Sequence, residues 1–170
     1  HPNGFLVGFD GRDVYFSESY RPHAWPPEYV LSTEYPIVGF GIYGTTVVVL
    51  TEGFPSRATG VTPASMAMKD SPVAEPCMTR HGIQSMPEGV YFPGANGLML
   101  INATGMVNAS AAQLTKDEWQ LQYFPANIDS AQWQGFYVAF TSQTEGFIFS
   151  PRESMAGFTE MTRIWHQDGI

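Results

Sequence analysis

The sequence predicts an all-β chain of antiparallel meanders that repeat as β-propeller-like blades, with one or two short helices. Its 17 glycines and 13 prolines are spread between short apolar runs, a pattern typical of chains with many short strands and turns. Aromatic residues make up 14% of the chain, and they favour the half-buried surface of a sheet. The strongest signal is a recurring pair of turns that end in Gly and enclose a strand-like apolar run.

The repeats place the expected strands in order along the chain. The first turn glycine of each copy falls at positions 11, 44, 89, 135 and 169, and the central spacings of 45 and 46 match a four-stranded blade of about 40 to 50 residues. The outer spacings of 33 and 34 fit either shortened copies or a misplaced turn, and a fifth copy is expected to begin with residues 163–165. The other expected strands are residues 5–9 and 13–16, then 37–42, 45–51 and a run ending at Gly60, then 90–92 and 98–101, and finally 131–133, 136–141 and 147–149.

The segments between the copies have a different composition. Residues 20–29 contain three prolines and three aromatic residues, so we expect an extended, non-strand connector whose rings pack onto a neighbouring surface. Residues 62–66 combine an N-cap threonine with a proline at the first helical position, which predicts a short helical turn at best. Residues 115–122 predict a helix, because Thr115 and Glu118 form a capping box.

The charge and composition argue against several classes of protein. The net charge is −8 with only eight Lys and Arg, whereas a protein that reads nucleic acid needs a concentrated basic surface. No apolar run approaches the ~20 residues of a membrane span, and the single cysteine, Cys77, leaves no internal disulfide. The opening His1-Pro2-Asn3-Gly4 has neither an initiator Met nor a signal-peptide pattern. We therefore expect residues 1–170 to form one propeller-like region of a longer chain, without a membrane span.

No group of residues in the sequence predicts catalysis or a metal. The four histidines, at positions 1, 23, 81 and 166, lack metal-ligand spacing, and residues 10–13 are better explained as a hairpin turn than as a calcium loop. Cys77 is expected to be a small buried residue at the start of a strand. A glycoside hydrolase would need carboxylates such as Glu18, Glu28 and Asp129 to face each other, which the sequence does not predict. We therefore expect a protein that is not an enzyme and that holds no cofactor.

Aromatic side chains are the candidate interface or ligand-stacking residues. The four tryptophans either stack on sugars at the surface or fill cores between blades, beside other apolar residues. Asn102 and Asn108 head formal N-glycosylation tripeptides, which matter only in a secretory chain. The candidate interface or stacking residues are Tyr20, His23, Trp25, Tyr29, Trp133 and Trp165.

Several segments together resemble propeller-like proteins encoded by tailed phages. They are residues 17–26, 37–41, 47–51, 89–91 and 146–153, with Cys77 between them, so the resemblance covers most of the chain. These segments and their order along the chain resemble the tail nozzle proteins, or tail tubular proteins B, of short-tailed phages. The resemblance implies a virion structural protein in a ring of six copies, which contacts neighbouring tail proteins and lets DNA pass through its channel. The alternative is a carbohydrate- or receptor-binding propeller module.

Overall fold

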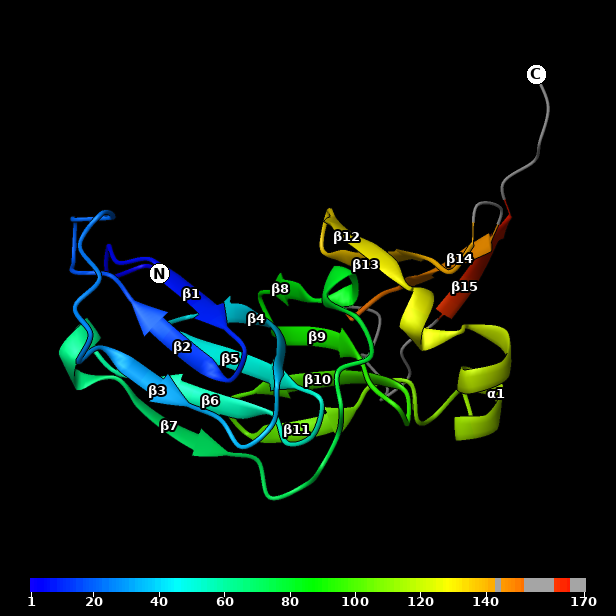
Figure 1. Ribbon diagram of the computed structural model, residues 1–170. Coiled ribbons are helices and arrows are strands. Elements are labelled where there is room, and N and C mark those ends of the chain that lie inside the picture. The colour runs from blue at the N-terminus through cyan, green and yellow to red at the C-terminus, as the bar shows by residue number, and fades with distance from the viewer. Residues whose placement is uncertain (143–144, 152–160, 166–170) are drawn as a thin grey trace. The chain divides into compact units, whose positions relative to one another are not determined.

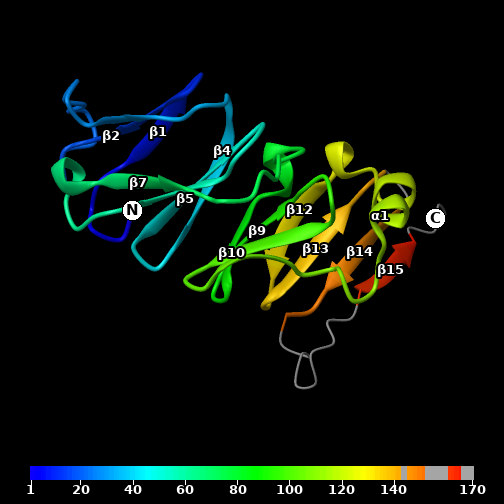
Figure 2. The ribbon, with the colours of Figure 1, turned by 90° about the horizontal axis from the view of Figure 1, so that it is seen from below.

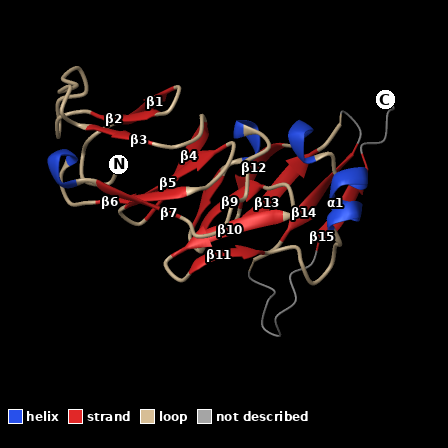
Figure 3. Ribbon diagram, turned by 60° about the horizontal axis from the view of Figure 1, so that its bottom comes forward, coloured by secondary structure: helices blue, strands red, loops and turns tan. Residues whose placement is uncertain are grey.

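The computed structural model describes residues 1–142, 145–151 and 161–165, and this part of the chain is mostly β (Figure 1). The strands form four small antiparallel sheets of three or four strands, and one short α-helix accompanies them (Figure 3). The all-β, antiparallel prediction is therefore confirmed, while the described residues show no closed or propeller arrangement. The chain divides into two compact units, His1–Cys77 and Met78–Ile170, each with two of the sheets.

The first unit contains two meander sheets, in which each strand pairs with the next strand along the chain. Tight turns connect the first hairpin of each sheet at Gly11 (φ 58°) and Gly44 (φ 53°), as the recurring turn pattern predicts. The strands are β1 (Val7–Asp10), β2 (Asp13–Phe16) and β3 (Val30–Ser32) in the first sheet, and β4 (Ile37–Tyr43), β5 (Thr46–Thr51), β6 (Ser56–Thr59) and β7 (Ala67–Asp70) in the second.

The two sheets of the first unit share one hydrophobic core. Phe16 of β2 and Val47 and Val49 of β5 belong to the same cluster of buried side chains. Burying a side chain of this kind stabilises a fold by about 1.5–3 kcal/mol. The first strands of the two sheets, β1 and β4, lie beside each other, so the sheets meet through their faces and at their first strands.

The second unit repeats this plan with two four-stranded sheets (Figure 2). The third sheet has the order β11-β10-β9-β8, and the fourth has the order β12-β13-β14-β15. The strands are β8 (Gln84–Met86), β9 (Gly89–Pro93), β10 (Leu98–Asn102) and β11 (Gly105–Asn108) in the third sheet, and β12 (Asp129–Trp133), β13 (Phe136–Phe140), β14 (Glu145–Phe149) and β15 (Met161–Trp165) in the fourth.

The end of the chain differs from the sequence-based expectation. Residues 163–165 do not begin a fifth copy, because they lie in β15, which pairs antiparallel with β14 as the last strand of the fourth sheet. Residues 150–160 connect β14 to β15, a segment much longer than the tight turns whose glycine spacing the prediction uses. The turn expected at Gly169 lies outside the described residues.

The α-helix and one 3₁₀ turn form where the sequence predicts them. Helix α1 (Lys116–Gln122) begins after the N-cap Thr115, whose hydroxyl accepts a hydrogen bond from the Glu118 N–H at 3.3 Å, while the Glu118 carboxylate accepts from the Thr115 N–H at 2.8 Å. A 3₁₀ turn at Pro63–Ser65 confirms the helical turn expected at residues 62–66. Two more 3₁₀ turns, Arg80–Gly82 and Pro125–Asn127, were not predicted.

Aromatic side chains fill the core between the third and fourth sheets. Trp119 of α1, Tyr137 of β13 and Phe147 of β14 are fully buried in one cluster. The Trp119 Nε1–H donates to the Gly94 carbonyl at 2.8 Å, and the Tyr137 hydroxyl donates to the Gly82 carbonyl at 2.8 Å. These bonds remove the cost of burying the polar ends of the two rings. Helix α1 therefore contributes Trp119 to the core, and this side chain helps to hold the helix in place.

The first strands of the third and fourth sheets, β8 and β12, lie beside each other as β1 and β4 do. The Gln84 side-chain amide on β8 donates to the Ser130 carbonyl on β12 at 2.9 Å and to its hydroxyl at 3.1 Å. The Ser130 hydroxyl in turn donates to the His81 carbonyl at 3.1 Å. Side-chain hydrogen bonds therefore join the two sheets along these strands.

Candidate functional site

The connector between β2 and β3 carries four of the candidate residues and is held in place by backbone hydrogen bonds. Tyr20 adopts a left-handed conformation (φ 59°), and its N–H donates to the Gly4 carbonyl at 2.7 Å. The Glu18 N–H donates to the Ala24 carbonyl at 2.8 Å. The connector is therefore non-strand, as expected, but the expectation of an extended path is wrong, because these bonds fold it into successive turns.

The four candidate side chains of the connector have different surroundings. Tyr20 is 83% exposed, Trp25 is 41% exposed, and His23 is also exposed. The Trp25 ring lies against Gly8 of β1, and its Nε1–H donates to the Pro22 carbonyl at 2.9 Å. Tyr29 is half-buried against the core of the first unit, and burial and then Glu18 raise its pKa. Three of the four are therefore available to a ligand, and Tyr29 is largely a packing residue.

The remaining candidate aromatic residues belong to the second unit. Trp133, at the end of β12, is 58% exposed and stacks on Phe136 with ring centroids 6.2 Å apart and an interplanar angle of 27°. Trp165 is the last residue of β15, and its side chain lies outside the described part. Trp119 fills a core, whereas Trp25 and Trp133 are at the surface. The core-filling interpretation therefore holds for Trp119, and sugar stacking by the two surface tryptophans stays a prediction.

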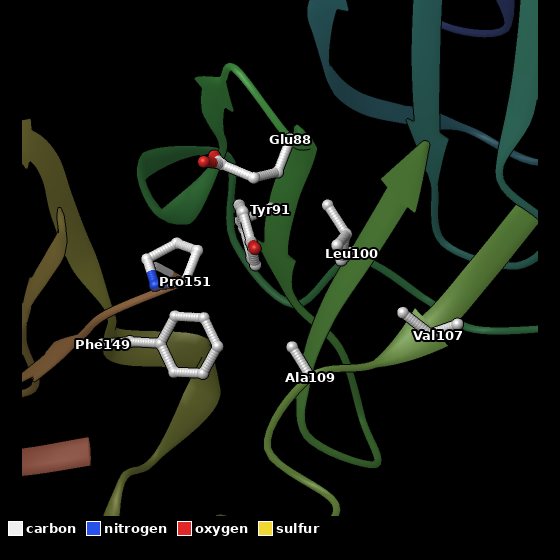
Figure 4. Close-up of a pocket in the computed structure, with 7 residues that line it drawn as sticks. All are labelled: Glu88, Tyr91, Leu100, Val107, Ala109, Phe149 and Pro151. Atoms are coloured by element: carbon white, nitrogen blue, oxygen red, sulfur yellow. The ribbon is translucent and has the colours of Figure 1, made fainter. Parts of the chain in front are cut away.

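A pocket of about 220 Å³ opens in the second unit, in a place that sequence reasoning missed. Figure 4 shows Phe149 and Pro151 on one side of it, Leu100 on the other, and Glu88 and Tyr91 at one end between them. Glu88 lies in the turn between β8 and β9, and Tyr91 lies on β9. The seven lining residues are Glu88, Tyr91, Leu100, Val107, Ala109, Phe149 and Pro151.

The polar groups of this pocket are a carboxylate and a phenol. The Glu88 Oε2 atom is buried and has no hydrogen-bond partner within the described part of the chain. The Tyr91 side chain is 2% exposed, and burial, followed by the charge of Glu88, raises its pKa. Tyr91 therefore stays a neutral phenol at ordinary pH. The arrangement is a largely apolar pocket with one negative group.

The asparagines of the glycosylation tripeptides have a structural explanation. The Asn102 side-chain oxygen accepts from the Thr104 N–H at 2.9 Å and from its hydroxyl at 2.6 Å. The Asn108 oxygen accepts from the Ser110 N–H and hydroxyl, both at 3.0 Å. A side chain that bonds the backbone two residues on is a common way to fix a turn. The spacing of both tripeptides therefore follows from turn formation.

The other polar candidates are placed as follows. Asp10 and Asp13 face each other across the β1–β2 hairpin, which confirms the turn interpretation of residues 10–13. Cys77 is buried as expected, but it does not start a strand, since its N–H donates to the Thr51 carbonyl at 2.9 Å well before β8 begins. Among the described residues, no three His, Cys, Asp or Glu side chains gather in a way that could hold a metal ion.

Comparison with models of known protein families gives no match to this sequence, and comparison with curated proteins gives none either. In the described ranges, no helix has the length and apolar character needed to cross a membrane.

Proposed function

We propose that the chain is a virion structural protein whose meander sheets serve as propeller-like blades in a ring of a phage tail. The resemblance to tail nozzle proteins suggests this role. The observation that carries it is the plan common to both units: two consecutive meander sheets share a core and approach each other at their first strands. Neighbouring blades of a propeller pack in this way around a central channel.

The charge of the chain supports a channel through which DNA passes without being held. With a net charge of −8, the protein repels the phosphate backbone more than it attracts it. The proposed partners are further copies of the chain, six if the resemblance to tail nozzles holds, and neighbouring tail proteins, with DNA only as a cargo in transit. In this role the protein acts as a scaffold and catalyses no reaction.

The test is the oligomeric state of the purified protein. Light scattering coupled to size exclusion should give a mass several times the 18.8 kDa of one chain, and negative-stain images should show rings with a central hole. Peptides of the chain should also occur in purified virions. A protein that stays monomeric over a wide range of concentrations would contradict the proposal.

The alternative, a carbohydrate- or receptor-binding module, is favoured by one observation. Trp133 exposes 58% of its surface while it stacks on Phe136, and such a platform suits the apolar face of a sugar ring. If this alternative holds, a glycan array should detect a ligand that Trp133→Ala loses and Trp25→Ala retains. The structural proposal predicts that neither the parent chain nor either variant binds a glycan.

A further inference from the structure

The pocket of the second unit differs from an ordinary packing defect in its size and its chemistry. Its volume of about 220 Å³ exceeds the ~150 Å³ of an apolar cavity that is large enough for benzene. Most of its wall is apolar, with Leu100 and Val107 on one side and Phe149 on the other. An apolar ligand alone would fill the volume, but it would leave the carboxylate of Glu88 without a partner.

Glu88 gives the pocket its charge preference. Its Oε2 atom is buried and lacks a hydrogen-bond donor among the described residues. A buried carboxylate oxygen without a donor costs free energy, and a charged N–H group is the donor that relieves this cost best. The Glu88 charge also acts on Tyr91, whose pKa is raised first by burial and then by this carboxylate. A cation bound here would therefore meet one negative group and a neutral phenol.

The aromatic rings narrow the choice of cation. Tyr91 and Phe149 both line the pocket, and their rings meet at a centroid distance of 5.5 Å with an interplanar angle of 60°. A planar guanidinium stacks on aromatic faces and binds a carboxylate through paired N–H groups, whereas an ammonium is compact and more strongly hydrated. The apolar side chains suit the methylene stem that carries such a group.

We infer that this pocket binds an alkylguanidinium group, such as an arginine side chain, with the guanidinium at Glu88 and the stem along Leu100 and Val107. This site goes beyond the proposed scaffold function and exists in a single chain, whether or not the protein forms a ring. A divalent metal would need more carboxylates than the single one in the pocket, and an anion would be repelled by Glu88.

The test is a titration of the whole chain followed by the methyl NMR signals of Leu100, Val107 and Ala109. The probes are butylguanidinium, its neutral analogue butylurea, and butylammonium. Butylguanidinium should shift these signals in a saturable way and bind at least about tenfold more tightly than butylurea, because charge-assisted hydrogen bonds are roughly twice as strong as neutral ones. It should also bind more tightly than butylammonium.

Two variants connect the binding to the pocket. Glu88→Gln keeps the shape of the side chain and should weaken butylguanidinium binding about tenfold. Glu28→Gln, which changes an exposed carboxylate in the first unit, should leave the affinity unchanged. The comparison of the three probes in the unaltered protein remains decisive if Glu88→Gln fails to fold.

A peptide probe shows whether the natural ligand is an arginine side chain of a protein or a small guanidinium compound. A short peptide with a central arginine should produce the same shifts if the ligand is a protein side chain, and its citrulline counterpart should not. Shifts with butylguanidinium but not with the peptide would indicate a small free guanidinium compound. The inference is overturned if butylguanidinium gives no saturable shift, or if butylurea or butylammonium binds as tightly.

Discussion

At the scale of single residues, the hairpins depend on glycines whose backbone conformation is strained for any other residue. Gly89, at the start of β9, has a φ of 148°. A Cβ atom at this position would overlap the Ile101 carbonyl oxygen of the paired strand β10 and come within 2.8 Å of the Leu100 side chain. The residue is thus required both by the turn and by the close approach of two strands.

Replacement of Gly89 should therefore lower the free energy of unfolding more than replacement of a turn glycine that has no atoms close to it. Gly105 has a similar φ of 140°, but a Cβ there would meet no atom within 4 Å. We expect Gly105→Ala to lower the free energy of unfolding by about 1–3 kcal/mol through backbone strain, and Gly89→Ala to lower it by about 1–3 kcal/mol more through overpacking. Urea denaturation of both variants measures the difference, and equal losses would contradict it.

We expect Tyr91 to make the free energy of unfolding fall as the pH rises above 10. Burial and then the Glu88 charge raise the pKa of Tyr91 above the ordinary value of 10.0. Between pH 10 and the pKa in the folded state, Tyr91 therefore loses its proton in the unfolded chain but keeps it in the folded chain. This stabilising contribution is complete below pH 10 and is lost as the pH rises further. Urea denaturation between about pH 9 and about pH 11 should show a decline that is shallower in Tyr91→Phe.

Glu88→Gln provides the internal comparison for this titration. It removes the second cause of the raised Tyr91 pKa and leaves the burial, which is the larger cause, so its decline should resemble that of the parent chain more closely than that of Tyr91→Phe. A decline that is the same in all three proteins would show that other groups control the alkaline stability.

At the scale of elements, helix α1 is held by a capping motif and by one buried side chain. It has only seven residues, and isolated helices shorter than about 12 residues are marginal. The Thr115–Glu118 capping box supplies hydrogen bonds at its first turn, and Trp119 attaches it to the core. The cap and the tryptophan therefore replace the stability that length would give.

Removal of the cap should loosen the helix without changing the sheets. We expect Thr115→Ala to lower the free energy of unfolding by about 1 kcal/mol, and amide exchange should quicken in α1 while β9 stays protected. Gln122→Ala, at the exposed C-terminal end, should change stability by less than about 0.5 kcal/mol. Faster exchange throughout the second unit would show that the helix is needed for the whole core.

The pKa of Glu118 gives the same cap a pH dependence. The hydrogen bonds from Thr115, first the backbone and then the hydroxyl, lower this pKa below its ordinary value of 4.5. The folded helix therefore favours the ionised carboxylate, and its contribution is present above about pH 4.5 and lost as the pH falls through the lowered pKa. The stability difference between the parent chain and Glu118→Gln should shrink accordingly in acid.

The contrast between hairpins and connectors shows which elements the sequence could predict. A tight hairpin is a local structure, and the Asp10-Gly11 turn carries its own signal because Gly accepts the required φ. The connector at residues 20–29 is different, because its turns depend on the bond from the Tyr20 N–H to the distant Gly4 carbonyl. The prolines of the connector predict a segment without strands, but they do not predict how its backbone folds.

At the scale of the whole molecule, the pocket could not be predicted because its walls are far apart in the sequence. The sequence predicts a strand at residues 90–92, which includes Tyr91, but Glu88 lies in the turn before β9 and Phe149 comes from another sheet. Only the packing of the third and fourth sheets brings them together. The candidate residues chosen from the sequence include Trp25 and Trp133, which are exposed, and leave out Trp119, which is buried.

The net charge of −8 leads to a prediction about assembly and DNA. Like-charged copies repel each other, and salt screens this repulsion over a Debye length of about 10 Å at 0.1 M. If the chain forms the proposed ring, sedimentation velocity should therefore show a larger ring fraction at about 500 mM than at about 20 mM salt. Rings that dissociate as salt rises would indicate attractive ion pairs between copies.

The same charge predicts how the protein behaves toward DNA. Labelled duplex DNA should show no anisotropy change with the protein at about 50 mM salt, where nonspecific binding is strong for basic proteins. DNA binding that weakens with salt would mean that the protein holds DNA by its phosphates, which contradicts the proposed passage of DNA without retention.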